Sequence, residues 1–303
     1  MQINNQITIT GVSGFLGKNL FAYLKTDYEV ESMRVRYVPN QSFEINSETI
    51  IHLAGKAHDL KKTANPQEYY EANLELTKQI FDSFLVSEAK VFIFMSTVKA
   101  VADEVNFVLK EDAIPNPKTH YGISKQLAEK YILEAKLPIG KRIYILRPCM
   151  IHGPSNKGNL NSFYQWVSKG IPWPLGSFVN KRSFCSIENL CFIIKELIEN
   201  PAISSGIYNI ADDDAIATNE LIHLIGIARK RKNIILNIPI FVIKAIAKIG
   251  DWIHLPLNSE RLQKLTESYI VSNEKIKKAI EKPLPIDAKS GLLKTFNSFE
   301  SHD

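Results

Sequence analysis

Cysteine is scarce in this chain, and its few cysteines form no pattern typical of a disulfide framework or a zinc site. Cys149, Cys185 and Cys191 are odd in number and none belongs to a C-x-x-C pair. A reducing, cytoplasmic setting is the simplest interpretation of this usage. The first residues also lack a basic stretch followed by an apolar one, so no secretory signal is predicted.

Charge of one sign is not concentrated in the way that long nucleic-acid-binding tails require. The 37 basic and 32 acidic residues give a formal net charge of +5 and are scattered along the sequence. We therefore expect no nucleic-acid partner. A mildly basic surface suits an anionic small molecule.

Apolar runs long enough to cross a membrane are also missing. The most apolar segment, residues 234–249, is interrupted by Asn237, Lys244 and Lys248, well short of the roughly 20 residues that a membrane span needs. Lys244 and Lys248 are one helical turn apart, so the segment is predicted to be a basic amphipathic helix. We expect it to pack onto its own domain, and membrane contact is the less favoured alternative.

The pattern of strands and helices indicates an α/β fold in a chain of 303 residues, of which 45% are hydrophobic. Strands are predicted at residues 3–10, 29–38, 49–54, 90–95 and 142–146, and helices at 18–25, 66–87 and 121–135. Such alternation is typical of a doubly wound parallel sheet of the Rossmann type. We expect a dinucleotide-binding domain at 1–150. A smaller substrate-binding lobe is expected mainly at 151–303, with some segments returning to the sheet.

A glycine-rich turn joins the first predicted strand to the first predicted helix. In Thr10-Gly-Val-Ser-Gly-Phe-Leu-Gly17, the glycines at 11, 14 and 17 allow a tight turn and close approach of the main chain to a pyrophosphate. The N-terminus of the following helix attracts negative charge. The sequence therefore predicts a dinucleotide-phosphate site that is built from the backbone.

A tyrosine and a lysine four residues apart offer acid/base chemistry. Tyr121 and Lys125 lie one turn apart on the predicted helix 121–135, and hence on one face. A nearby ammonium stabilises a phenolate and should lower a tyrosine pKa that is normally about 10. The pair follows the glycine turn by about 110 residues and comes after a strand that ends at Ser96 and Thr97.

In this order, the three features resemble the extended short-chain dehydrogenase/reductases of the NAD-dependent epimerase/dehydratase family, in the branch that modifies nucleotide sugars. The glycine turn matches the family's TGxxGFLG loop at every fixed position. The resemblance implies that Tyr121 exchanges a proton with a sugar hydroxyl or ketone and that Thr97 orients this oxygen. It also implies that Lys125 binds the nicotinamide ribose and that Ser96 lies beside the nicotinamide.

Further segments carry the same resemblance. His52-Leu-Ala-Gly55 is similar to the family's element over the cofactor, and Asn65–Asn73 is similar to a helix whose asparagine braces the catalytic lysine. Arg147–Pro154 resembles the segment that covers the nicotinamide, with His152 in place of a tyrosine. The resemblance thus assigns cofactor contacts to Gly11, Ser13, Gly14, Phe15, Leu16, Gly17, Leu53, Ala54, Gly55, Asn73, Ser96, Tyr121, Lys125 and Pro148.

The substrate side is predicted from three residues. Asn159 and Arg182 match positions that hold the diphosphate in nucleotide-sugar members of the family. The planar fork of an arginine suits paired phosphate oxygens. Lys99 either touches the substrate or is a solvated lysine. A homodimer through the helix that bears Tyr121 is a further expectation from the resemblance.

The cofactor and the reaction follow from less specific features. Arg34 lies near the end of the second predicted strand, where an arginine accommodates a 2′-phosphate, so NADP is favoured over NAD. This favours a 4-ketoreductase for a UDP-4-keto-6-deoxy-N-acetylhexosamine. The alternatives are an NAD-dependent 4-epimerase of UDP-hexoses or UDP-N-acetylhexosamines, or of a lipid-linked sugar, and a dinucleotide-binding regulator without catalysis. Val98-Lys99, where dehydratases carry Asp-Glu, argues against elimination.

Overall fold

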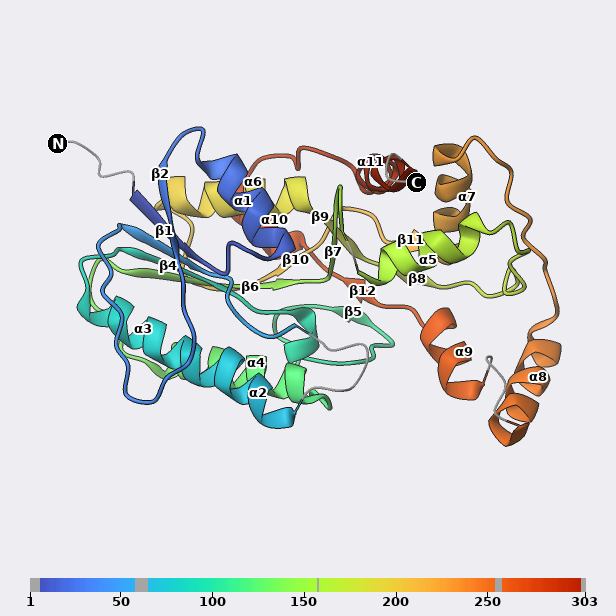
Figure 1. Ribbon diagram of the computed structural model, residues 1–303, viewed down its shortest axis with the longest axis horizontal. Helices are drawn as coiled ribbons and strands as arrows, with labels where there is room; N and C mark the ends of the chain where they lie inside the picture. The colour runs from blue at the N-terminus through green and yellow to red at the C-terminus, as the bar shows by residue number, and fades with distance from the viewer. Residues whose placement is uncertain (1–5, 58–64, 157, 254–257, 301–303) are drawn as a thin grey trace.

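A six-stranded parallel sheet forms the centre of the larger lobe (Figure 1). The computed structural model describes residues 6–57, 65–156, 158–253 and 258–300. In spatial order the strands are β10 (Gly206–Ile210), β6 (Arg142–Pro148), β4 (Val91–Met95), β3 (Thr49–His52), β1 (Gln6–Thr10) and β2 (Glu29–Met33). The strand order reverses between β1 and β3, and such a switch point is where ligands bind in open parallel sheets.

Helices cover both faces of this sheet, which confirms the predicted doubly wound α/β fold. One face carries α1 (Phe15–Leu24), α6 (Ile187–Glu199) and α10 (Glu274–Ile280) (Figure 1). The other face carries α2 (Pro66–Tyr70), the π-helical turn η1 (Glu71–Glu75), α3 (Leu76–Val86) and α4 (His120–Glu134). Because helices cover both faces, most central strands are apolar throughout rather than alternating.

Some element boundaries differ from the prediction. The strand predicted at 29–38 ends at Met33, since β2 is an edge strand with a neighbour on one side only. The strand predicted to stop before Arg147 continues through Pro148, because a proline at a strand end sacrifices little of the hydrogen-bond ladder. Residues 3–5 of the first predicted strand lie outside the described residues.

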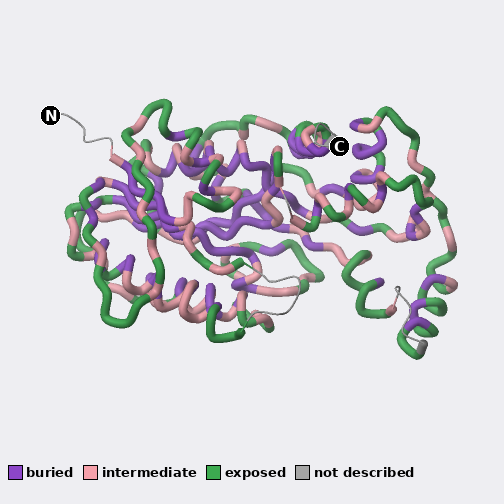
Figure 2. The backbone as a smooth tube through the Cα atoms, in the orientation of Figure 1, coloured by how far each residue is buried: buried purple, intermediate pink, exposed green. Residues whose placement is uncertain are grey.

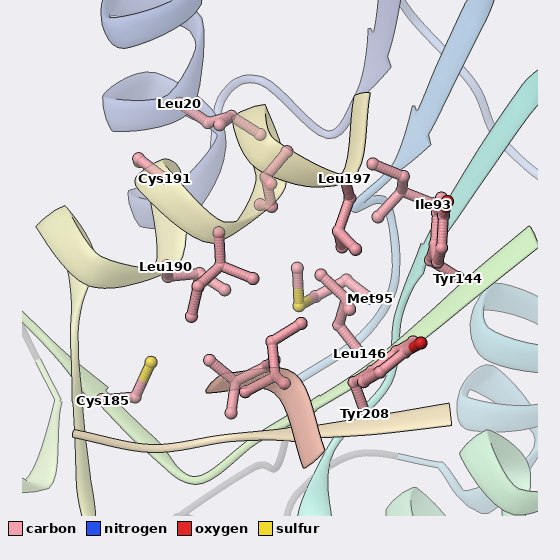
Figure 3. Close-up of a cluster of buried hydrophobic side chains, with 14 of the residues drawn as sticks. Leu20, Ile93, Met95, Tyr144, Leu146, Cys185, Leu190, Cys191, Leu197 and Tyr208 are labelled. Atoms are coloured by element: carbon pink, nitrogen blue, oxygen red, sulfur yellow. The ribbon is translucent and has the colours of Figure 1, made fainter. Parts of the chain in front are cut away.

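The main hydrophobic core lies between the sheet and helices α1 and α6 (Figure 3). Leu20 of α1, Ile93 of β4 and Leu190 of α6 are completely buried there. Burying one such side chain contributes about 1.5–3 kcal/mol. Cys185 and Cys191 belong to the same cluster, and all three cysteines of the chain are free and buried. Figure 2 shows the buried residues concentrated along the central strands.

The smaller lobe lies at the other end of the molecule and has its own core (Figure 1). Its elements are β7 (Met150–His152), α5 (Asn159–Ser168), β8 (Lys181–Arg182), β9 (Phe184–Ser186), β11 (Ile216–Ala217), α7 (Thr218–Ala228), α8 (Ile240–Ile253), α9 (Ser259–Thr266) and α11 (Ala288–Glu300). Short strands β5 (Val108–Leu109) and β12 (Ile270–Val271) pair between the lobes.

The segment predicted as one helix at 234–249 divides into two parts. Residues 234–239 are extended and bridge to Trp173 and Leu175, while the helix α8 begins at Ile240. Pro239, directly before α8, fits a helix start because proline is tolerated in the first turn. Within the described part of the chain, no helix is both long and apolar enough to cross a membrane.

Candidate active site

The glycine turn packs against the segment that follows β3, at the switch point of the sheet. A side chain at Gly11, which has φ +75°, would place its Cβ 2.7 Å from the amide nitrogen of Ala54. A Cβ at Gly17 would lie 2.3 Å from the carbonyl oxygen of Gly11. Helix α1 follows Gly14 with no side-chain cap and no acidic residue in its first turn. The open helix N-terminus therefore fits a pyrophosphate.

A buried histidine fixes the main chain opposite the glycine turn. The Thr10 hydroxyl accepts hydrogen bonds from the amides of Leu53 and Ala54 and lies 2.8 Å from Nδ1 of His52. Nε2 of His52 lies 3.1 Å from the Thr77 hydroxyl, which itself donates to a carbonyl four residues earlier. The ring therefore accepts at Nδ1 and donates at Nε2. Burial, helped by the charge of Lys125, lowers the pKa of His52 to about 3, so the ring is neutral.

The three predicted catalytic residues meet at the carboxyl end of β4. Thr97 follows this strand, and its hydroxyl is hydrogen-bonded to the phenol of Tyr121 on α4. Lys125, one turn further along α4, donates to the carbonyl of Met95 at 2.8 Å and lies over the Phe94 ring. Thus α4 and β4 together hold an alcohol, a phenol and an amine at one edge of the sheet.

The expected lowering of the tyrosine pKa by the lysine is wrong for this structure. Burial raises the pKa of Tyr121, and the hydrogen bond from Thr97 only partly opposes this. Burial also lowers the pKa of Lys125 to about 8, against a smaller raising effect of Glu129. Desolvation disfavours the charged form of each group and is the largest cause of both shifts. The two pKa values therefore move apart, with that of Lys125 below that of Tyr121.

Asn73 joins the segment after β3 to helix α4. Its side chain accepts from the amide of Lys56 at 2.8 Å and donates to the Ser124 hydroxyl at 3.0 Å. It lies in η1, where the π-helical turn interrupts an otherwise α-helical segment, a feature common at functional sites. A Cβ at Gly55 would be 2.6 Å from Oδ1 of Asn73. Asn73 thus supports Lys125 through the adjacent Ser124.

A buried ion pair beneath the site was not predicted from the sequence. Glu129 binds Arg147 through three hydrogen bonds, of which the shortest is 2.6 Å, and both side chains are 3% exposed. Glu129 also accepts from the Ser96 hydroxyl. Glu129 stands four residues after Lys125, as Lys125 stands four after Tyr121. That spacing was the available signal, because it places all three side chains on one helical face.

Two of the three predicted substrate residues lie together, and both are occupied by neighbouring groups. Lys99 donates to the carbonyl of Asp103 and lies 4.6 Å from the centre of the Tyr269 ring. Arg182 donates hydrogen bonds to the carboxylate and the main-chain carbonyl of Glu267 and to the main-chain carbonyl of Lys264. Its charge helps to lower the pKa of Lys99, although burial is the larger cause. The third residue, Asn159, is exposed at the start of α5.

Two other motif residues have distinct surroundings. His152 is buried between Thr295 of α11, 2.9 Å from Nδ1, and Asp212, 3.4 Å from Nε2. It therefore links α11 to the segment after β10. Arg34 directly follows β2 and is exposed, at the position where a ribose contact was predicted.

Known proteins are similar to this chain in both sequence and fold. The model of the NAD dependent epimerase/dehydratase family matches residues 7–211. UDP-glucose 4-epimerase of Vibrio cholerae is 32% identical over 80% of this chain and 81% of its own length. N-acetyl-alpha-D-glucosaminyl-diphospho-ditrans,octacis-undecaprenol 4-epimerase of Escherichia coli O157:H7 is 24% identical over 91% and 86%.

Solved structures share the architecture at lower identity. RMD from Pseudomonas aeruginosa, complexed with NADPH, has a TM-score of 0.72 and 19% identity, covering 98% of this chain and 99% of the other. MoeE5 in complex with UDP-glucose and NAD has a TM-score of 0.73 and 16% identity, with the same coverage. The family match extends over more than half of the sequence and agrees with the resemblance of its motifs. The chain belongs to the NAD dependent epimerase/dehydratase family, the extended short-chain dehydrogenase/reductases.

Proposed function

We propose that this enzyme is an NAD-dependent 4-epimerase of a UDP-linked hexose or N-acetylhexosamine. The observation that carries this proposal is the 32% identity with a UDP-glucose 4-epimerase over four fifths of the chain. The buried Thr97 and Lys125, with the half-buried Tyr121 between them in the site, provide the acid/base groups that oxidation of a sugar alcohol requires.

The chemistry assigned to the protein itself is proton transfer and orientation. In its phenolate form Tyr121 takes the proton of the C4 hydroxyl, and Thr97 holds the same oxygen through a hydrogen bond. A nicotinamide dinucleotide held by the glycine turn would supply the acceptor for the C4 hydride and the means to return it. Between these steps the 4-keto sugar must turn over in the site, after which Tyr121 returns the proton. Lys125, fixed by the Met95 carbonyl, would bind the ribose of the nicotinamide.

The diphosphate of the substrate is assigned to Arg182 and Lys99. Both cations are partly buried, and both now contact main-chain carbonyl oxygens that a phosphate could replace. Glu267 pairs with Arg182 at 3.3 Å, and burial raises the pKa of its carboxyl group. This carboxylate occupies the fork of Arg182 that the diphosphate would need. Substrate binding therefore requires an exchange of Glu267 for phosphate at Arg182.

A 4-ketoreductase, first favoured from the sequence, is the second candidate. The specific observation in its favour is Arg34, exposed directly after β2 and able to bind a 2′-phosphate. A relative at 24% identity is named GDP-6-deoxy-D-mannose reductase, from Pseudomonas aeruginosa. The greater identity and coverage of the epimerase outweigh these points. A lipid-linked diphosphate sugar is an alternative substrate, favoured by the relative from E. coli O157:H7.

Product analysis with two cofactors separates the candidates. The purified enzyme is incubated with UDP-glucose or UDP-N-acetylglucosamine, with and without added NAD, and the C4 epimers are separated by chromatography. The proposal expects interconversion without net change in absorbance of the reduced nicotinamide. Consumption of one NADPH for each UDP-4-keto-6-deoxy-N-acetylhexosamine, together with no epimerisation, would support the reductase instead. Tyr121→Phe serves as the inactive control in both assays.

A further inference from the structure

Helix α8 leaves an apolar face uncovered. Ile243, Ala247 and Gly250 are buried, so one side of the helix packs against the rest of the lobe. On the opposite side, Phe241 is 74% and Trp252 is 84% exposed. Successive steps of four, four and three residues place Phe241, Ala245, Ile249 and Trp252 on that side. The expectation that the segment packs onto its own domain therefore holds for one face only.

Lysines border this apolar face. Lys244 and Lys248 are exposed, one turn apart, along the flank next to Phe241 and Trp252. In the described part of the chain neither lysine forms an ion pair, whereas Asp251, the acid of this helix, bonds to Ser259 at the start of α9. The positive charge of the two lysines is thus available to an anionic partner. We call Phe241, Ala245, Ile249 and Trp252, with Lys244 and Lys248, the α8 surface.

The segment that leads into α8 has the same character. Residues 229–239 run from the end of α7 to α8 along the outer edge of the smaller lobe (Figure 1). Lys230, Arg231 and Lys232 are exposed at the start of this segment, and Ile234 and Leu236 are exposed further along it. One edge of the molecule therefore combines five exposed cations with exposed aliphatic and aromatic side chains.

We propose that the α8 surface docks onto an anionic phospholipid bilayer. A helix with Phe, Trp and Ile on one side and lysines beside them suits the boundary between acyl chains and headgroups. Trp tends to lie at the headgroup level because its ring is apolar and its N–H is polar. The cations at residues 230–232, 244 and 248 complement phosphatidylglycerol and similar lipids.

The docked orientation would bring the substrate side of the enzyme towards the bilayer. Helix α8 packs against α9, and the residues at the end of α9 hold Arg182 through the Lys264 and Glu267 carbonyls. The proposal concerns binding to a surface and does not depend on which sugar is epimerised. Epimerisation of UDP-sugars in vesicle-free buffer is therefore measured alongside, so failure of one proposal is distinguishable from failure of the other.

Vesicle binding by the full chain tests the proposal. The protein is sedimented with vesicles of phosphatidylcholine alone and of equimolar phosphatidylcholine and phosphatidylglycerol. We expect binding to the second and little to the first, and a loss of binding at high salt. Of the three tryptophans, Trp173 is buried and Trp166 partly buried, so insertion of Trp252 should shift the emission to shorter wavelength. The Trp252→Phe variant should lack this shift and still bind.

Substitutions give the magnitude and the control. Phe241→Gln and Trp252→Gln should each weaken partitioning by roughly tenfold or more. Neutralising Lys230, Arg231 and Lys232 to Gln should weaken it by roughly fivefold per residue. Ile139→Gln, at a fully exposed isoleucine of the larger lobe, is the matched control and should bind as the wild type does. All variants should retain UDP-sugar turnover, which shows that they fold.

Absence of sedimentation with anionic vesicles would overturn the proposal. So would binding that Phe241→Gln and Trp252→Gln leave unchanged. If light scattering instead shows a dimer that Phe241→Gln and Trp252→Gln dissociate, and vesicles do not bind, the α8 surface is a contact between two copies of the chain.

Discussion

The polar residues at the catalytic centre and those around Arg182 have different surroundings. In the larger lobe, Glu129 and Arg147 are 3% exposed and bonded to each other, and His52 is held on both sides by threonines. In the smaller lobe, Arg182 is about one quarter exposed and binds carbonyl oxygens and a carboxylate. The first arrangement is rigid because each group has a fixed protein partner. In the second arrangement Arg182 can exchange its partners, because its hydrogen bonds to a phosphate are at least as strong as those to these partners.

We propose that this difference corresponds to two tasks. A cofactor that stays bound through the reaction needs a fixed surface, such as the glycine turn and the main chain at residues 53–55. A substrate that enters and leaves, and whose ring must turn over, needs contacts that can be replaced. Variants of the larger lobe should therefore affect the chemical step or the fold, whereas variants of Arg182 and Glu267 should mainly affect substrate affinity.

The largest effect is expected from Tyr121→Phe. Removing the phenol hydroxyl removes the proton acceptor for the sugar alcohol, so turnover should fall by about 10²–10⁴-fold with a similar KM. Steady-state epimerisation measures this. Tyr70→Phe is the matched control. The Tyr70 hydroxyl contacts His120, the first residue of α4, and has no assigned role. A Tyr121→Phe enzyme with more than a tenth of wild-type turnover would contradict the assignment.

Arg182→Met should act on affinity. Loss of a charge-assisted hydrogen bond to phosphate costs about 1.5–3 kcal/mol, which corresponds to a KM roughly ten- to a hundredfold higher, with kcat nearly unchanged. Glu267→Gln should have the opposite sign and lower KM severalfold, because the competing carboxylate is gone. If Arg182→Met and Glu267→Gln changed kcat to the same extent, the surroundings of Arg182 would be as rigid as the larger lobe.

The buried His52 of the larger lobe should make the unfolding free energy fall at acidic pH. The folded-state pKa of His52 is about 3, below the ordinary value near 6.5, so only the unfolded chain binds this proton as the pH falls through 6.5. His52 should therefore remove about 2 kcal/mol of unfolding free energy between pH 6.5 and 4.5. Urea titrations of wild type and His52→Gln measure this difference. The exposed His223→Gln variant should keep the wild-type pH dependence.

The smallest effect is expected at the exposed end of the cofactor site. Arg34→Ser should reduce binding of NADPH relative to NADH by about tenfold, since one charge-assisted contact to the 2′-phosphate is lost. Fluorescence titration with both dinucleotides measures the ratio. Lys18→Ser, which removes an exposed cation from α1, is the control. An unchanged ratio would remove the one observation that favours the reductase.

The sequence predicts the larger lobe better because its features are local. The turn at Gly11–Gly17 and the spacing of Tyr121 and Lys125 are each contained within a few residues, and the geometry of a strand or helix relates them to function. The partner of Glu129 is Arg147, on another element, so periodicity along α4 could indicate a shared face but not the ion pair. The direction of the Tyr121 pKa depends on burial, which the spacing to Lys125 does not contain.

The smaller lobe is built from distant segments. Arg182 finds its partners 82 to 85 residues later, near the end of α9, and His152 finds Thr295 143 residues later. Such contacts leave no periodic pattern in one stretch of sequence. The sequence also could not predict which side of α8 is exposed. The alternation of apolar residues and lysines indicates an amphipathic helix but does not show which side the rest of the lobe covers.

The most direct test of the central claim follows a label at C4. UDP-glucose carrying deuterium at C4 is incubated with the enzyme and with an excess of unlabelled NADH or NADPH in solution, and the epimer is analysed by mass spectrometry. The account predicts that the UDP-galactose formed retains its deuterium, because the hydride removed from C4 returns to the same carbon within one site. Loss of deuterium to the solution cofactor, with no labelled epimer, would contradict the proposed epimerase.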